Sequence, residues 1–116
     1  MSTSAPSANE YRLNLISLHC SRKQDAIGRD EPKLLVNGVS VFGPGDMGKG
    51  DTVDLRPRFA LFSSVAQIKL TEVDPGPDDD LGTVTASAAQ AGQGTQFGEF
   101  STPGADYDIV YEVVPA

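Results

Sequence analysis

Leu34 to Phe42 reads LLVNGVSVF and places Asn37-Gly38 between two apolar pairs. Both residues of an Asn-Gly pair tolerate the positive φ angles that a two-residue hairpin turn requires. An Asn-Gly pair flanked by apolar residues is the strongest short-range signal for a β hairpin. The stretch therefore predicts two antiparallel strands joined by a tight turn.

The segment before this hairpin, Tyr11 to Cys20, reads YRLNLISLHC and is dense in apolar residues. Its period shifts, because Leu13 and Leu15 would share one face of a strand whereas Ile16 and Leu18 would share the other. Such a change of phase is typical of a central strand with a β bulge, or of one whose two faces are both covered. We expect a central strand here.

Further short strands are expected after the hairpin, over residues 51–55, 65–73, 81–87, 95–100 and 107–114. In the last of these, Tyr107, Ile109, Tyr111 and Val113 fall on one face. With 12 Gly and 8 Pro the chain is broken too often for a helical bundle. About eight turn-separated strands predict an all-β fold, an eight-stranded antiparallel β-sandwich. We expect residues 1–9 to form a disordered tail and residues 10–116 a single domain.

Composition narrows the classes of function. The chain has 116 residues and a formal charge of -7, from 9 basic and 16 acidic residues, which argues against nucleic-acid binding. A single cysteine, Cys20, excludes an internal disulfide framework and a cysteine-based zinc site. No apolar run approaches the ~18 residues of a membrane span, and no signal peptide is visible. We therefore expect a soluble protein that is cytoplasmic or released by a signal-peptide-independent route.

Residue patterns for catalysis are incomplete. Gly43 to Lys49 matches the first seven positions of a P-loop, but Gly50 stands where Ser or Thr must hold magnesium, and the next residues predict a strand instead of a helix. His19 is the only histidine and is expected to pack or to cap, while Cys20 is expected to be a small buried hydrophobe. The protein is not predicted to be an enzyme.

The acidic residues gather in two predicted loops. Like charges ~4 to 5 Å apart repel by about 3 to 4 kcal/mol per pair at an effective dielectric of ~20, and a hard divalent cation removes that cost. Calcium accepts about 6 to 8 oxygen ligands in tolerant geometry. The other interpretation is a solvated acidic surface that favours solubility. The residues concerned are Asp25, Asp30 and Glu31 in the first loop and Glu72, Asp74, Asp78, Asp79 and Asp80 in the second.

The spacing of these acids resembles the C2-domain family of calcium-dependent modules. In that family the first loop holds an Asp, five residues, then Asp-Pro; Asp25 and Glu31-Pro32 have this spacing, with Glu in place of Asp. The later family loop holds Asp-x-Asp, then an Asp before an apolar residue and Gly. Glu72-x-Asp74 and Asp79-x-Leu81-Gly82 fit if the loop is one residue shorter. The predicted last strand resembles the permuted, type II topology.

The resemblance implies a non-enzymatic, C2-like module that binds calcium, about two ions, and through it a membrane surface or a protein or carbohydrate partner. Asp80 could replace Asp79 as a ligand, and Asp30 could replace Glu31. Basic residues around the first loop either meet an anionic surface or only balance its acids: Arg22, Lys23, Arg29 and Lys33. The alternative function is a metal-independent structural or assembly subunit of a larger complex. The implied metal ligands are Asp25, Asp30, Glu31, Glu72, Asp74, Asp78, Asp79 and Asp80.

Overall fold

The computed structural model describes residues 10–22, 30–73 and 76–116, so the tail expected over residues 1–9 lies outside the described residues. Almost all regular structure in the described ranges is β. The elements are β1 (Tyr11–Arg22), β2 (Pro32–Val36), β3 (Val39–Phe42), β4 (Thr52–Asp54), β5 (Phe59–Phe62), β6 (Val65–Glu72), β7 (Asp79–Ser87), the short 3₁₀ helix η1 (Ala88–Gln90), β8 (Thr95–Thr102) and β9 (Ala105–Pro115).

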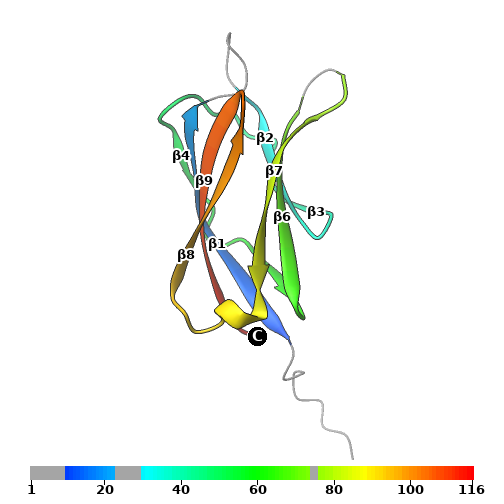
Figure 1. Ribbon diagram of the computed structural model, residues 1–116, viewed down its shortest axis with the longest axis vertical. Coiled ribbons are helices and arrows are strands. Elements are labelled where there is room, and N and C mark those ends of the chain that lie inside the picture. Colours follow the sequence, from blue (N-terminus) through cyan, green and yellow to red (C-terminus); the bar gives the residue numbers. More distant parts are fainter. Residues whose placement is uncertain (1–9, 23–29, 74–75) are drawn as a thin grey trace, which may run out of the picture.

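The strands form two antiparallel sheets that face each other as a sandwich (Figure 1). One sheet has the order β4-β1-β9-β8, and β5 also pairs with β1; the other has the order β3-β2-β6-β7. Edge strands β7 and β8 pack beside each other on one side of the sandwich. The predicted all-β sandwich is confirmed.

The strand count differs from the sequence prediction, because the described residues form nine strands instead of eight. The additional strand is β5, which pairs with residues 11–14 of β1. Phe59 and Leu61 are exposed on this strand and only Phe62 is buried. A four-residue strand with one buried side chain has too weak a period to stand out from the flanking loops.

A β bulge explains the phase shift in β1. The pairing of β1 with β9 changes register between Leu15 and Ser17. Leu13 and Leu15 before the bulge, and Leu18 and Cys20 after it, are all fully buried. The bulge interpretation was right, but the placement of Leu18 on the opposite face was wrong, because the extra residue returns it to the core side.

The hairpin and the last strand are as predicted. Asn37 and Gly38 have φ angles of 49° and 85°, which form the tight turn between β2 and β3. The Asn37 side chain also accepts a hydrogen bond from the Gln67 backbone N–H at 2.8 Å, which fixes the turn against β6. The predicted inward face of β9 is buried throughout and joins the core with the leucines of β1: Tyr107, Ile109, Tyr111 and Val113.

The glycine-rich segment between β3 and β4 is a loop that leads into a strand and not into a helix. Met47 is buried and forms a β bridge with Asp30, and Asp51 accepts the Gly48 backbone N–H at 2.8 Å.

Cys20 is buried, as expected. The Nδ1 atom of His19 lies 2.6 Å from the Thr52 hydroxyl on β4. Across the ranges described, no helix is long and apolar enough to cross a membrane.

Candidate functional site at the loop end of the sandwich

Strand register brings the two acidic segments to one end of the second sheet. Pro32 at the start of β2 pairs with Glu72 at the end of β6, and Glu72 pairs with Asp79 at the start of β7. The Glu31 backbone N–H donates to Glu72 Oε2 at 3.2 Å. The Glu31 carbonyl accepts the Val73 N–H at 3.0 Å. Glu31 just before β2, Glu72 at the end of β6 and Asp79 at the start of β7 therefore lie at the same end of the second sheet. Figure 1 shows these ends of β2, β6 and β7 at the top of the sandwich.

Burial differs strongly among these acids. The Glu72 side chain is buried, with 1% exposure, whereas Asp79 is half-buried and Glu31 is exposed. A buried carboxylate is costly unless hydrogen bonds or a cation compensate it. The backbone N–H of Glu31 provides one such hydrogen bond. The Glu72 carboxylate is therefore positioned by the protein backbone at the ends of the strands, and it has almost no contact with solvent.

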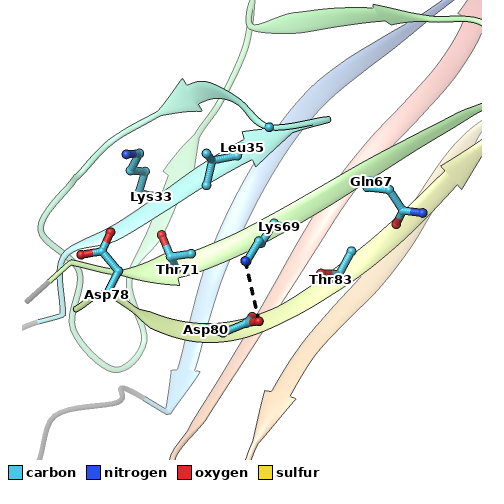
Figure 2. A pocket seen from close by; sticks show the side chains of 9 residues that line it. Lys33, Leu35, Gln67, Lys69, Thr71, Asp78, Asp80 and Thr83 are labelled. Carbon is cyan, nitrogen blue, oxygen red and sulfur yellow. Dashed lines mark ion pairs between the residues drawn. The ribbon is translucent and has the colours of Figure 1, made fainter.

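Asp78 and Asp80 lie on the outer face of the second sheet. Asp80 Oδ1 accepts the Gly82 backbone N–H at 2.9 Å, and its Oδ2 lies 3.8 Å from the Lys69 ammonium. Figure 2 shows both acids beside Lys33, Lys69 and Thr71 around a surface hollow of about 560 Å³. Lys69 already balances Asp80, so this face carries mixed charge.

Asp30 points into the sandwich. Its side chain is fully buried, and the Tyr107 hydroxyl donates to its Oδ2 at 2.5 Å. Burial raises the pKa of Tyr107 far above its ordinary value, and the hydrogen bond to Asp30 raises it further. No local signal in the sequence points to this contact, because the alternating pattern of residues 107–113 identifies Tyr107 only as a core residue. The position of the Asp30 carboxylate, directed toward β9, fits a structural role in the core.

The described acids do not by themselves assemble a metal site. Asp25 and Asp74 lie outside the described residues. Among the residues that are described, no group of three or more His, Cys, Asp or Glu side chains is arranged to hold a metal ion. Glu31, Glu72 and Asp79 offer carboxylate oxygens, which are the type of donor that hard cations prefer.

The basic residues around the first loop have separate environments. Arg22 lies 3.8 Å from Asp106 on β9 and donates to the Thr102 carbonyl at 3.1 Å. Lys33 lines the outer hollow shown in Figure 2. Lys23 and Arg29 lie outside the described part of the chain. Arg22 thus balances an acid of the last strand.

The strand order defines a C2-like β-sandwich. The last strand, β9, lies inside the first sheet between β1 and β8. Solved C2 domains have the same fold. An isolated C2 domain aligns over 90% of this chain and 97% of its own, with 12% identity and a TM-score of 0.54. C2 domain A of a plant extended synaptotagmin 1 aligns over 97% of this chain and 98% of its own, with 10% identity and a TM-score of 0.58.

Larger proteins contain the same fold as one part. Human GIVD cytosolic phospholipase A2 aligns over 90% of this chain but only 16% of its own, with 13% identity and a TM-score of 0.60. The tandem C2 domains A and B of extended synaptotagmin 2 align over 98% of this chain and 45% of theirs, with 14% identity and a TM-score of 0.58. No family model and no curated protein sequence matches this chain. At these identities the likeness establishes the fold.

Proposed function

We propose that this domain is a non-catalytic C2-like module that binds calcium at the loop end of the second sheet. The observation that supports this proposal most is the register Pro32↔Glu72↔Asp79, since it joins the bases of two acidic loops. The proposed ligands are Asp25, Asp74 and Asp79, with Glu31 and Glu72 next. Asp78 and Asp80 would support the site through their charge. Asp30 is omitted, because its carboxylate accepts the Tyr107 hydroxyl in the core.

A calcium ion at this place would supply positive charge and open coordination positions. Carboxylates of the loops would hold the ion, and a phosphate, carboxylate or sugar hydroxyl of a partner would complete its coordination. Glu72 would anchor the base of the site, because the Glu31 backbone N–H orients its Oε2. The partner would be an anionic membrane surface or a protein or carbohydrate with such oxygens.

Thermal unfolding in calcium and in chelator tests the proposal. At 100 times its dissociation constant, calcium should raise the free energy of unfolding by about 2.7 kcal/mol. Asp79→Asn and Asp74→Asn should each reduce the shift. Glu99→Gln on β8 is a matched control, because it removes one exposed carboxylate away from the site. A midpoint unchanged by millimolar calcium contradicts calcium binding. Liposome sedimentation and protein pull-down, each with and without calcium, separate the two classes of partner.

The second candidate function is a metal-independent assembly subunit. The exposed apolar side chains favour it, because several of them lie at sheet edges or strand ends: Val39, Phe59, Leu61 and Val65. Association that persists in chelator and in the Asp74→Asn and Asp79→Asn variants would support this function.

A further inference from the structure

An open groove lies between the edge strands β3 and β5. β3 is the terminal strand of its sheet, and β5 pairs with β1 alone. In the described parts of the chain, neither strand has a β partner on its outer side. The groove is shallow and open to solvent, with a volume of about 800 Å³, and its lining residues are Val39, Ser40, Val41, Arg56, Pro57, Arg58 and Phe59.

Arg58 lines this groove and Arg12 lines an adjoining hollow, and neutral groups hold both side chains in place. The Arg12 guanidinium lies 3.8 Å from the centre of the Phe59 ring, and its Nε donates to the Asn14 side chain at 2.8 Å. The Arg58 guanidinium lies 5.2 Å from the centre of the Phe42 ring, and it donates to the Leu55 carbonyl at 3.3 Å. Stacking and one hydrogen bond restrict each side chain while its other N–H groups stay available.

The charge around Arg56 to Arg58 is positive on balance. Arg56 forms a two-point ion pair with Asp54, at 3.0 Å for each contact. Neither Arg12 nor Arg58 forms an ion pair with a carboxylate of the described residues. Glu112 lines a second hollow together with Arg12 and residues 56–58. Its carboxylate offsets one of the two positive charges of Arg12 and Arg58. The region therefore keeps one excess positive charge on a chain whose net charge is -7.

Apolar side chains are exposed beside the arginines. Val39 is 66% exposed and Phe59 is 45% exposed, and both line the groove. Aromatic residues and arginine are enriched where proteins bind one another, because they combine large contact area with directional hydrogen bonds. The arginine fork matches a carboxylate in two-point geometry.

We propose that this groove binds a short extended segment of another polypeptide that carries both apolar and acidic side chains. The segment would lie along the outer edge of β3, where main-chain groups are available for strand addition. Its apolar side chains would contact Val39 and Phe59, and its carboxylates would pair with Arg12 and Arg58. This inference is independent of calcium.

A second copy of this chain fits the groove less well. Its own acidic stretch runs from Glu72 on β6 to Asp80 on β7; Glu72 pairs with Asp79 and Thr71 pairs with Asp80, so both ends of the stretch are held in paired strands and it is not a free extended segment. A two-fold contact through β3 would bring the arginines of both copies together. Net charge of -7 also opposes association of copies.

Fluorescence anisotropy with a labelled, blocked peptide Gly-Asp-Val-Glu-Leu-Asp-Gly tests the proposal, in chelator and at low salt. We expect saturable binding below millimolar protein that weakens as salt rises from ~0.05 to ~0.3 M. The double variant Arg12→Gln/Arg58→Gln should bind roughly fivefold more weakly or worse, whereas Glu112→Gln should bind more tightly. Lys49→Gln, at an exposed lysine in another loop, is the control for loss of one positive charge and should leave binding unchanged.

Two control peptides test the specificity of binding, and an NMR titration locates the binding site. Replacing the three acids by Lys, or the Val and Leu by Ser, should abolish binding. Amide chemical shifts should move at residues 39–42 and 59–61. The proposal is overturned by equal binding of the Lys peptide, by unchanged affinity in a folded arginine variant, or by shifts confined to other strands. Concentration-dependent self-association in ultracentrifugation without peptide binding would also overturn it, in favour of a second copy.

Discussion

The Tyr107 hydroxyl donates a 2.5 Å hydrogen bond to the Asp30 carboxylate across 77 residues of sequence. Tyr107 belongs to β9 in one sheet, and Asp30 lies just before β2 in the other. Both side chains are fully buried. This contact joins the two sheets and holds the start of β2, from which Glu31 and Pro32 reach the candidate site.

Removing the Tyr107 hydroxyl should destabilise the domain. Tyr107→Phe takes one donor from a buried carboxylate, and we expect a loss of about 1 to 3 kcal/mol in the free energy of unfolding. Tyr111→Phe is the matched control, because its hydroxyl bonds the Gln90 side chain at 3.2 Å in a part-buried position. Urea unfolding of both variants measures the difference. Equal losses of stability in the two variants would contradict the prediction, because the hydrogen bond to Asp30 would then contribute no more than the bond to Gln90.

The same contact predicts sensitivity to alkali. Burial and Asp30 raise the pKa of Tyr107 in the folded state above its ordinary value of 10.0. The unfolded chain therefore releases this proton first, so the folded chain binds more protons above pH ~10. The contribution of Tyr107 to the free energy of unfolding should be fully present below that pH and should be lost as the pH rises further. In urea unfolding from pH 8 to 11, Tyr107→Phe should show a shallower decline than the parent. Parallel curves would contradict the prediction.

Asp54 should titrate at unusually low pH. Hydrogen bonds from the Arg56 side chain and backbone lower the pKa of its carboxyl from 3.8 to about 2. A lowered pKa stabilises the folded state above pH ~4, and this contribution is lost as the pH falls toward 2. The effect on stability should be small, because the pair is exposed. Carbon-detected NMR of the carboxyl gives the midpoint directly, and Arg56→Gln should move it back toward 3.8. A parent midpoint near 4 would refute the ion pair in solution.

Local chemistry made parts of the fold predictable. The Asn37-Gly38 turn was correct because Asn and Gly themselves favour the positive φ angles that it requires. The buried face of β9 was correct because strict alternation needs no partner to be recognised. Leu18 was placed on the wrong face, since the β bulge that redirects it depends on pairing with β9.

The candidate site was less predictable than the fold. Pairing of Glu72 with Asp79 follows from the β6–β7 hairpin and was within reach of the sequence. The inward direction of Asp30 was not, because its hydrogen-bond partner is Tyr107 on a distant strand. The positions of Arg12 and Arg58 were likewise beyond the sequence pattern, because β5, which carries Phe59, has too weak a period to predict a strand. The direction of Asp30 and the positions of the two arginines depend on contacts between residues that are far apart in the sequence.

Gly98 on β8 tests the packing of the edge where β7 and β8 meet. A Cβ at this position would lie 2.5 Å from Val84 Cγ1 and 3.2 Å from Ile109 Cγ2. Valine is stiff about χ1, so it cannot swing aside freely. Gly98→Ala should therefore destabilise the domain by about 1 to 3 kcal/mol in urea unfolding. Gly76→Ala should be close to neutral, because nothing lies within 4 Å of its Cβ position. Adding Val84→Ala to Gly98→Ala should recover part of the loss, since it removes both methyl groups that clash. If the double variant is less stable than Gly98→Ala alone, contact with Val84 is not the cause.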